Sequence, residues 1–551
     1  MLRLTDIKLD LNHKPEALKQ AILTKLGIDE TQLLNFSVFR RGYDARKKNV
    51  ITLIYSLDVS TTIEDKLLAN FSRDPHVKLT PDMSYKLVTQ ASENITQRPV
   101  VIGMGPCGLF AGLLLAQMGF KPIILERGKE VRERTKDTFG FWRKKILNTE
   151  SNVQFGEGGA GTFSDGKLYS QVKDPKHYGR KVIEEFIKAG APDEIKYVSK
   201  PHIGTFKLVT MVEKMRATII ELGGEIRFSQ RVDELHFDDK NHQQVTGLTL
   251  ATGETITTNF VALAIGHSAR DTFKMLHDKG VYMQAKPFSI GFRIEHEQSA
   301  IDDARFGINA GHEILGSADY KLVHHCKNGR SVYSFCMCPG GTVVAAASEE
   351  GRLVTNGMSQ YSRHERNANS AIVVGISPED FPLKDGQPDV LAGIELQRKL
   401  EEKAFVLGGE NYDAPTQLVG DFIAGRASGE HGDVIPSYKP GVKYCDLSQL
   451  LPDYATEAVR EALPAFERKI KGFANKNATL TAVETRTSSP VQLTRDKHSL
   501  QSLNTQGLYP AGEGAGYAGG ILSAGIDGIK IAEAMALAMM ATSDNEQKMN
   551  K

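Results

Sequence analysis

Residues 98–127 read RPVVIGMGPCGLFAGLLLAQMGFKPIILER and set the architecture of this chain. A short apolar run at 100–102 leads into the glycine-rich segment 103–108, and an uncharged helical pattern follows. A second apolar run, 122–125, then ends at Glu126. Strand, glycine turn, helix, strand and acid in this order are typical of a dinucleotide-binding βαβ unit.

Each glycine of the turn has a distinct expected role. Gly103 allows a tight turn, Gly105 lets the backbone approach a pyrophosphate, and Gly108 lets the helix pack against the strands. The helix N-terminus offers free N–H groups and a partial positive charge to the phosphates. Glu126 follows Gly103 at about the twenty-residue spacing expected of an acid that binds a ribose.

Two other interpretations of this stretch stay open. The first is a membrane-spanning segment, because residues 100–120 carry no charge and are about long enough to span a bilayer. The five glycines and the proline in this stretch favour a buried βα unit instead. The second alternative is a Rossmann unit that has lost its ligand.

Composition narrows the class of protein. A chain of 551 residues predicts about two to four domains. Lys and Arg total 68 against 67 Asp and Glu, so no overall field attracts nucleic acid or an anionic membrane. The N-terminus lacks the apolar run of a signal peptide. Five scattered cysteines favour a reducing compartment over a disulfide framework. They include no CxxC pair, so we predict no metal site. We expect a cytoplasmic protein without a membrane segment; nucleic acid is not excluded, and the oligomeric state stays open.

Residues 1–95 predict a separate small domain. Strands and helices in the order βαββαβ suggest a ferredoxin-like α+β sandwich. The loop 40–48 between its middle strands is basic. A solvated hairpin tip is the favoured interpretation, and contact with a phosphate-rich ligand, with RNA or with a partner of the neighbouring domain is the alternative.

A second glycine-rich loop follows the βαβ unit. Five glycines between Gly156 and Gly166 exclude a regular helix or a central strand. Such a loop lets backbone N–H groups approach a large planar or anionic ligand. A flexible linker is the alternative, but Phe155 and Phe163 would be unusual in one.

The rest of the chain divides in two. An apolar strand, 260–265, ends at Gly266, where the loop should face a ligand crevice. From about 281 the pattern becomes antiparallel, with a strand at 286–294 and a hairpin with a glycine turn at 332–346. A third glycine-rich segment, 507–521, precedes a helix of small residues.

These features together resemble the two-part FAD-binding domain of the glutathione-reductase-like flavoproteins. Segments 155–168, 335–341, 356–359 and 485–490 are more closely similar to a bacterial family of uncharacterised FAD-dependent dehydrogenases, and this resemblance covers essentially the whole chain. It implies an α/β fold with a Rossmann-like FAD-binding domain in two parts, 96–280 and 476–545. Between them it implies an inserted α+β substrate or cap domain, 281–475.

The resemblance also implies the residues that contact FAD. The pyrophosphate would lie against the first glycine turn, the adenosine ribose at Glu126, the adenine at Arg127 and Val232, and the ribityl chain at Glu513, where the family usually has aspartate. The full set is Gly103, Gly105, Pro106, Cys107, Gly108, Glu126, Arg127, Gly158, Gly159, Ala160, Gly161, Thr162, Val232, Gly266, Gly512, Glu513, Gly519, Gly520 and Ile521.

Catalytic residues are harder to assign. His267 could relay a proton; the alternative is a loop histidine whose hydrogen bonds are satisfied within the protein. Arg293, Glu484 and Arg486 could orient an anionic substrate; the alternative is that they form ion pairs. Cys336 and Cys338 could form a redox disulfide, although packed thiols are favoured. Cys107 could have a lowered pKa at a helix N-terminus, although a packing role is favoured.

The main hypothesis is an FAD-dependent oxidoreductase that acts on a small molecule, with the flavin as its redox centre. The chain has no second strand–GxGxxG–helix unit, so NAD(P)H is expected only as a transient co-substrate. The alternatives are an RNA-associated flavoprotein that uses the basic loop, and a flavin-bound scaffold without turnover.

Overall fold

A parallel sheet lies at the centre of the computed structural model, which describes residues 1–238 and 243–549. Its strand order is β22-β11-β5-β6-β7, and all neighbours are parallel. The strands are β5 (Val100–Ile102), β6 (Ile123–Leu125), β7 (Glu225–Arg227), β11 (Val261–Leu263) and β22 (Leu508–Pro510). Parallel strands need cover on both faces, and the first glycine turn lies between β5 and the helix α3 (Pro106–Gln117).

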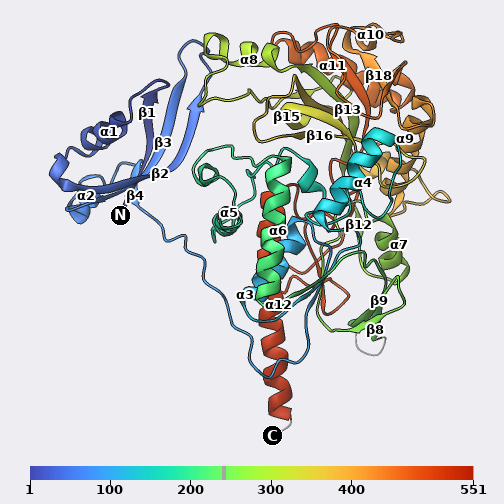
Figure 1. Cartoon of the computed structure of the whole chain (residues 1–551), viewed down its shortest axis with the longest axis horizontal. Coiled ribbons are helices and arrows are strands. Elements are labelled where there is room, and N and C mark those ends of the chain that lie inside the picture. The colour runs from blue at the N-terminus through green and yellow to red at the C-terminus, as the bar shows by residue number, and fades with distance from the viewer. Residues whose placement is uncertain (239–242, 550–551) are drawn as a thin grey trace.

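Alternate side chains of these strands enter two different cores. Val101, Ile124 and Ala262 pack with α3, α5 (Tyr178–Lys188), α6 (Thr205–Glu221) and the long helix α12 (Ile521–Met549). In Figure 1, α6 and α12 stand upright and α5 is seen end-on beside them. Val100, Ile123 and Val261 face the other way. They pack with α7 (Arg270–Asp278) and with the meander of β8 (Val232–Asp238), β9 (Gln244–Leu250) and β10 (Thr255–Thr257).

The membrane-span interpretation of residues 100–120 is therefore wrong. That stretch is a short strand followed by a helix buried on all sides inside the domain. Among the helices of the described residues, none combines the length and the apolar character needed to cross a bilayer.

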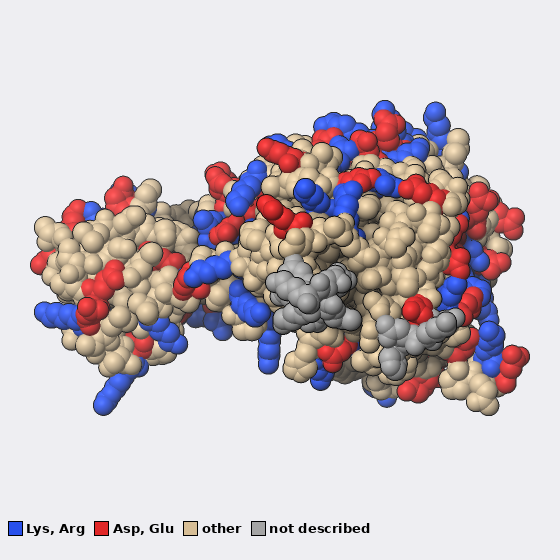
Figure 2. Space-filling view, turned by 90° about the horizontal axis from the view of Figure 1, so that it is seen from below, with Lys and Arg blue, Asp and Glu red and all other residues tan. Residues whose placement is uncertain are grey.

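The N-terminal unit stands apart as a lobe (Figures 1 and 2). Its antiparallel sheet has the order β2-β3-β1-β4 and carries two helices. The elements are β1 (Leu2–Asp10), α1 (Glu16–Leu26), β2 (Leu33–Asp44), β3 (Thr52–Thr61), α2 (Glu64–Asn70) and β4 (Val77–Leu79). Strict alternation of buried and half-buried residues along β3 shows why one face of this sheet forms the core.

Residues 40–44 of the predicted basic loop belong to β2, and residues 45–48 lie in the turn of the β2–β3 hairpin. This hairpin reaches the helix α8 (Gln298–Phe306) in Figure 1. The carbonyl oxygen of Lys48 accepts a hydrogen bond from Asn309 at 2.8 Å. Arg46 pairs with Asp44, and its side chain is 90% exposed. Lys, Arg, Asp and Glu are interspersed on the face shown in Figure 2, so that face has no field of one sign.

A second large sheet forms the cap above the parallel sheet (Figure 1). Its order is β14-β15-β17-β13-β20-β18-β19, and β16 also pairs with β15. The strands are β13 (Phe288–Glu297), β14 (Val323–His325), β15 (Ser331–Ala345), β16 (Thr355–Ser359), β17 (Asn367–Ile376), β18 (Ala414–Leu418), β19 (Val442–Tyr444) and β20 (Thr479–Glu484). The helices α9 (Ala392–Gly408), α10 (Val419–Ala424) and α11 (Asp453–Glu467) belong to this unit, and β12 (Gln284–Ala285) pairs with β21 (Val491–Gln492) beside it.

The predicted hairpin at 332–346 is wrong, because β15 runs through this region as one strand. Its glycines serve close backbone approach rather than a turn. A Cβ atom on Gly340 would lie 1.6 Å from the carbonyl oxygen of Arg363, and one on Gly341 would lie 2.3 Å from that of Met358.

Candidate functional site

A cavity of about 510 Å³ lies at the carboxyl ends of the central strands, between the parallel sheet and the cap. Gly103 after β5, Glu126 after β6, Ala264 after β11 and Ala511 after β22 all line it. This is the crevice that an open parallel sheet offers to a ligand. Residues of the cap, including Phe335, Cys336 and Glu484, close its other end.

In the first glycine turn, the geometry agrees with the roles predicted for Gly103 and Gly108. Gly103 has a φ of 96°, and a Cβ atom there would lie 2.4 Å from the carbonyl oxygen of Ala264. A Cβ atom on Gly108 would lie 1.9 Å from the carbonyl oxygen of Gly103, so this glycine serves helix packing. Gly105 caps α3 and lines the cavity, and a Cβ atom on it would have the Cα atom of Gly159 as its nearest neighbour, at 3.7 Å.

The second glycine loop packs directly on the first. A Cβ atom on Gly159 would lie 2.7 Å from the Cα atom of Gly105. Arg134 of α4 (Val131–Lys144) is fully buried beneath this loop, and its guanidinium donates to backbone carbonyls. The distances are 2.8 Å to Asn152, 2.8 Å to Val153, 3.3 Å to Gly156 and 2.7 Å to Glu157. Hydrogen bonds from Arg134 therefore hold this loop in a defined conformation, and the flexible-linker alternative is wrong.

Replacing this buried guanidinium tests the role of the brace. Arg134→Lys keeps the positive charge but cannot serve four carbonyl groups. We expect a loss of stability on the order of 3 kcal/mol, because buried carbonyls lose their donors. The measurement is the thermal unfolding midpoint. Arg132→Lys is the matched control on the same helix, since the Arg132 side chain is 68% exposed. Equal midpoints for the two variants would contradict the assignment.

Glu126 holds the two glycine loops together. Its carboxylate accepts backbone N–H groups from Met104 at 2.8 Å, Gly128 at 2.8 Å and Gly156 at 2.9 Å. It also lines the cavity, and a carboxylate has about four lone-pair sites, so capacity for a further donor is left. The neighbouring Arg127 also lines the cavity; its guanidinium lies 4.1 Å from the ring centre of Phe155.

Most of the predicted cofactor residues meet at this one cavity. Gly108, Gly158 and Thr162 do not line it; a Cβ atom on Gly158 would lie 2.2 Å from the Thr162 hydroxyl, so these residues pack behind the wall. The predicted residues that do line it are Gly103, Gly105, Pro106, Cys107, Glu126, Arg127, Gly159, Ala160, Gly161, Val232, Gly266, Gly512, Glu513, Gly519, Gly520 and Ile521.

Cys107 is not an activated thiol. Burial, followed by the charge of Asp527, raises the pKa of this thiol well above its ordinary value. The lowered pKa considered from its place at the start of α3 is therefore wrong, and its packing role is the one that the structure supports.

Some of the predicted catalytic residues line the cavity, and others lie behind the residues that line it. His267 lines the cavity and contacts the Ser268 hydroxyl at 3.0 Å; burial, then the charge of Arg486, lowers its pKa to about 3, so its imidazole is neutral near pH 7. Arg486 also lines the cavity, but its guanidinium pairs with the buried carboxylate of Glu401. Arg293 does not line it and pairs with Glu484 at 3.1 Å.

Glu484, which does line the cavity, has a raised pKa. Burial raises it to about 7, against the opposing charge of Arg293. Burial likewise raises the pKa of Glu513 to about 7, against the charge of Lys286. Two carboxyl groups with pKa values near neutrality therefore face the same cavity. A pKa near the working pH is the property that general acid–base catalysis needs.

Several charged residues in or beside the cavity were not predicted from the sequence. Lys167 lies at the cap end of the cavity, 3.1 Å from Asp165, and its ammonium also donates to the carbonyl oxygen of Met337. Arg363 pairs with the same carboxylate at 2.9 Å. Behind the late glycine segment, Asp527 of α12 accepts the N–H of Gly512 at 2.8 Å. Lys167 directly follows Gly166, the last glycine of the second glycine loop. Its place beside this loop is the only feature of the sequence that could have indicated it.

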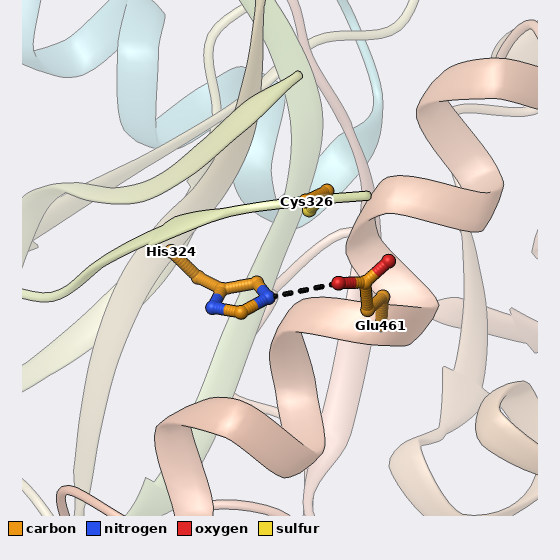
Figure 3. Close-up of side chains that lie close together, drawn as sticks. All are labelled: His324, Cys326 and Glu461. Atoms are coloured by element: carbon orange, nitrogen blue, oxygen red, sulfur yellow. Dashed lines mark hydrogen bonds and ion pairs between the residues drawn. The ribbon is translucent and has the colours of Figure 1, made fainter. Parts of the chain in front are cut away.

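A separate cluster of possible metal ligands lies in the cap (Figure 3). Within the described parts of the chain, His324, Cys326 and Glu461 are the group of such side chains close enough to share an ion. His324 and Glu461 already pair at 3.1 Å, and the Cys326 thiol donates to the carbonyl oxygen of Ala458 at 3.4 Å. Burial raises the pKa of Cys326 to about 11, so its thiol is neutral. These are the contacts of a hydrogen-bonded histidine and glutamate beside a packed thiol, and we assign the cluster no role in the chemistry of the cavity.

The fold and the cavity define an α/β protein with a large crevice between a parallel sheet and a second, mostly antiparallel sheet. Residues 287–487 match the family model described as FAD-dependent protein, C-terminal domain-like, and residues 1–60 match Domain of unknown function (DUF8436). The chain is 48% identical over 533 residues to an uncharacterized protein of Clostridium beijerinckii, covering 97% of this chain and 98% of that protein. The chain therefore belongs to the same protein family as this clostridial protein.

Solved structures give a more distant likeness. The flavin-dependent brominase Bmp2 aligns with a TM-score of 0.36 and 12% identity over 81% of this chain and 79% of that chain. CtdE in complex with FAD aligns with a TM-score of 0.32 and 11% identity over 81% of this chain and 84% of that chain. At such low scores, these likenesses carry no argument about function.

Proposed function

We propose that the protein is an FAD-dependent oxidoreductase of the dehydrogenase type, which acts on a small molecule held at the cap end of the cavity. The observation that carries the proposal is the convergence of three glycine-rich segments on one crevice at the carboxyl ends of the parallel strands. The match of the cap to FAD-dependent proteins supports the choice of cofactor.

The residues present fit FAD. Gly105 and Gly159 leave a cradle without side chains at the N-terminus of α3, whose partial positive charge favours an anion. In the proposal, Gly103 to Cys107 hold the pyrophosphate, Glu126 the ribose, and Arg127 and Val232 the adenine end. Gly512 and Glu513 hold the ribityl chain. FAD would supply the electron transfer itself.

The N-terminus of α12 faces the same cavity. Gly519, Gly520 and Ile521 line the wall where this helix begins. A helix N-terminus carries a partial positive charge, which would stabilise negative charge on the O2 side of the flavin. At the cap end, the carboxyl group of Glu484, whose pKa lies near neutrality, is placed to hold or move a proton on the substrate, and the neutral imidazole of His267 is placed to hydrogen-bond it.

The proposal includes the arrangement expected from the sequence: a Rossmann-like FAD-binding domain in two parts, an inserted cap and a ferredoxin-like N-terminal domain. In the proposal, NAD(P)H is a transient co-substrate rather than a resident cofactor. The five cysteines are free, which supports a reducing compartment, and we propose the cytoplasm.

The test begins with the purified protein. We expect a yellow protein with a visible flavin absorption band and FAD released in about equimolar amount on denaturation. Anaerobic mixing with NADH, with NADPH and with a metabolite panel then shows which reductant bleaches that band. A colourless protein that does not bind added FAD contradicts the proposal. A bound flavin that no reductant or oxidant in the panel affects favours the scaffold without turnover.

A further inference from the structure

Three side chains that can bind metal ions meet where β14 packs against α11 (Figure 3). His324 lies in β14, and Cys326 follows two residues later, just past the end of this strand. Residues two apart in an extended chain share a face, so both side chains turn toward α11, which supplies Glu461. The imidazole nitrogen, the sulfur and a carboxylate oxygen all lie within 4.8 Å of one another. Glu461 joins from a helix far along the chain, so no short sequence motif marks the cluster.

The spacing of these atoms fits one transition-metal ion. Zn²⁺ takes histidine nitrogen, cysteine sulfur and carboxylate oxygen as ligands at about 2.0–2.3 Å, which places two ligands of a tetrahedral ion about 3.5 Å apart. The Nε2 atom of His324 and the Oε1 atom of Glu461 are 3.1 Å apart. The Cys326 sulfur needs to move by only about 1 Å to complete the set. Mg²⁺ and Ca²⁺ take oxygen ligands, so the nitrogen and the sulfur favour a softer ion.

Backbone contacts hold two of the three ligands in place. The Glu461 carboxylate accepts the backbone N–H of Lys327 at 3.2 and 3.3 Å. The backbone N–H of Cys326 donates to the carbonyl oxygen of Arg330 at 2.8 Å, which closes the turn that carries the thiol. Contacts of this kind orient the ligands of a metal ion. The side chains of His324 and Glu461 are 22% and 33% exposed, which gives an ion a path from solvent.

We propose that His324, Cys326 and Glu461 bind one divalent transition-metal ion, with Zn²⁺ as the best match, and that water takes the fourth position. The thiolate is the ligand form of cysteine, so the ion displaces the thiol proton, which is now donated to the carbonyl oxygen of Ala458. The imidazole is neutral and coordinates through Nε2. The thiolate and the carboxylate together balance the two positive charges of the ion.

The ion would join the edge of the cap sheet to a helix. β14 is the end strand of this sheet, and its pairing with β15 spans only three residues. Ligands from β14 and from α11 would fix this edge, so that the free energy of metal binding adds to the stability of the cap. All three ligands lie outside the set of residues that line the cavity, so this role is structural and independent of the proposed function.

Cobalt titration of the purified, untagged full-length protein tests the site, without added thiol reagents. Co²⁺ binds the same ligand types as Zn²⁺, and a bond between Co²⁺ and a thiolate gives a strong absorption band. We expect this band to reach its maximum at about one Co²⁺ per chain. It is measured against the same protein before addition, so that any flavin absorption cancels. Zn²⁺ should then remove the band, because it binds such sites more tightly than Co²⁺. Zn²⁺ alone should raise the thermal unfolding midpoint.

Matched variants identify the ligands. Cys326→Ser should abolish the thiolate band, and Cys445→Ser, at a half-buried cysteine elsewhere in the cap, should keep it. His324→Gln should weaken Co²⁺ binding at least about tenfold, since the loss of an outer-shell partner alone costs this much. His325→Gln is its control, because the His325 ring contacts the Ser331 hydroxyl at 2.9 Å instead. The metal-free unfolding midpoint of each variant is measured alongside, and if Cys326→Ser does not fold, the histidine variants decide.

The same variants separate this site from the other thiols of the cap. Cys336 lines the cavity, Cys338 is buried behind it, and both are free. Co²⁺ bound at that pair would give a band that Cys326→Ser retains. Such a retained band overturns the inference, as does a wild type without a saturable band or with a midpoint that Zn²⁺ leaves unchanged. Equal Co²⁺ affinities of His324→Gln and His325→Gln overturn it as well.

Discussion

Gly105→Glu should yield a folded protein that has lost its flavin. Gly105 has a φ of −71°, which any residue adopts, and the space beside it is the cavity itself. The chain can therefore fold with a side chain at this position. The added carboxylate would fill the cradle between the two glycine loops and place a negative charge where the pyrophosphate is proposed to bind. We expect the affinity for FAD to fall by about 100-fold or more, equivalent to about 3 kcal/mol.

The measurement is FAD content after purification, followed by titration of the apoprotein with FAD. Gly140→Glu is the matched control: it makes the same substitution in α4, where an added Cβ atom meets nothing within 4 Å. The control should stay yellow, and both variants should keep the wild-type thermal unfolding midpoint of the apoprotein. Full flavin content in Gly105→Glu would show that the cofactor, if present, lies elsewhere.

Local sequence signals were sufficient for the centre of the fold. The segment 98–127 predicts two strands around a helix, and β5, α3 and β6 lie there within a few residues of the expected bounds. The reason is that each signal is local: buried parallel strands read as short apolar runs, and glycine marks the tight turn between strand and helix. The roles of Gly103 and Gly108 also follow from geometry within this one βαβ unit.

Residues that depend on contacts distant in sequence could not be predicted. Arg134 lies in a highly charged segment of the sequence, yet its side chain is fully buried under a loop that begins about twenty residues later. Lys167, Arg293 and Cys336 meet only because β13 and β15 belong to one cap sheet that is placed over the second glycine loop. Gly340 and Gly341 led to the wrong prediction of a hairpin at 332–346. Glycine is selected both in turns and where a neighbouring strand packs closely against the backbone, and here the second reason applies.

Glu401 connects the cap to the parallel-sheet domain, and its replacement should have the largest effect on stability. This carboxylate of α9 is fully buried and accepts from Arg270 of α7 at 2.7 and 3.0 Å. It also accepts from Arg486 at 3.0 and 2.9 Å and from the Thr485 hydroxyl at 2.8 Å. Removal of its charge leaves two buried guanidinium groups poorly compensated. Breaking a buried ion pair in this way costs about 3–5 kcal/mol.

The expected result is a clearly lower thermal unfolding midpoint for Glu401→Gln at pH 7. Glu402→Gln is the matched control, because Glu402 is exposed on the same helix, and it should unfold like the wild type. Equal midpoints for the two variants would show that the buried pair contributes no net stability.

The pH dependence gives an independent check on Glu401. Burial alone would raise the pKa of this carboxyl group, but the charges of Arg270 and Arg486 outweigh burial and hold the pKa well below its ordinary value of 4.5. A group whose pKa is lowered by folding contributes stability above its unfolded pKa and loses that contribution as the pH falls toward its folded pKa. The difference in midpoint between the wild type and Glu401→Gln should therefore be full above about pH 4.5 and shrink in more acidic solution. A difference that stays constant as the pH falls below this value would mean that lost packing, rather than the lost charge, destabilises the variant.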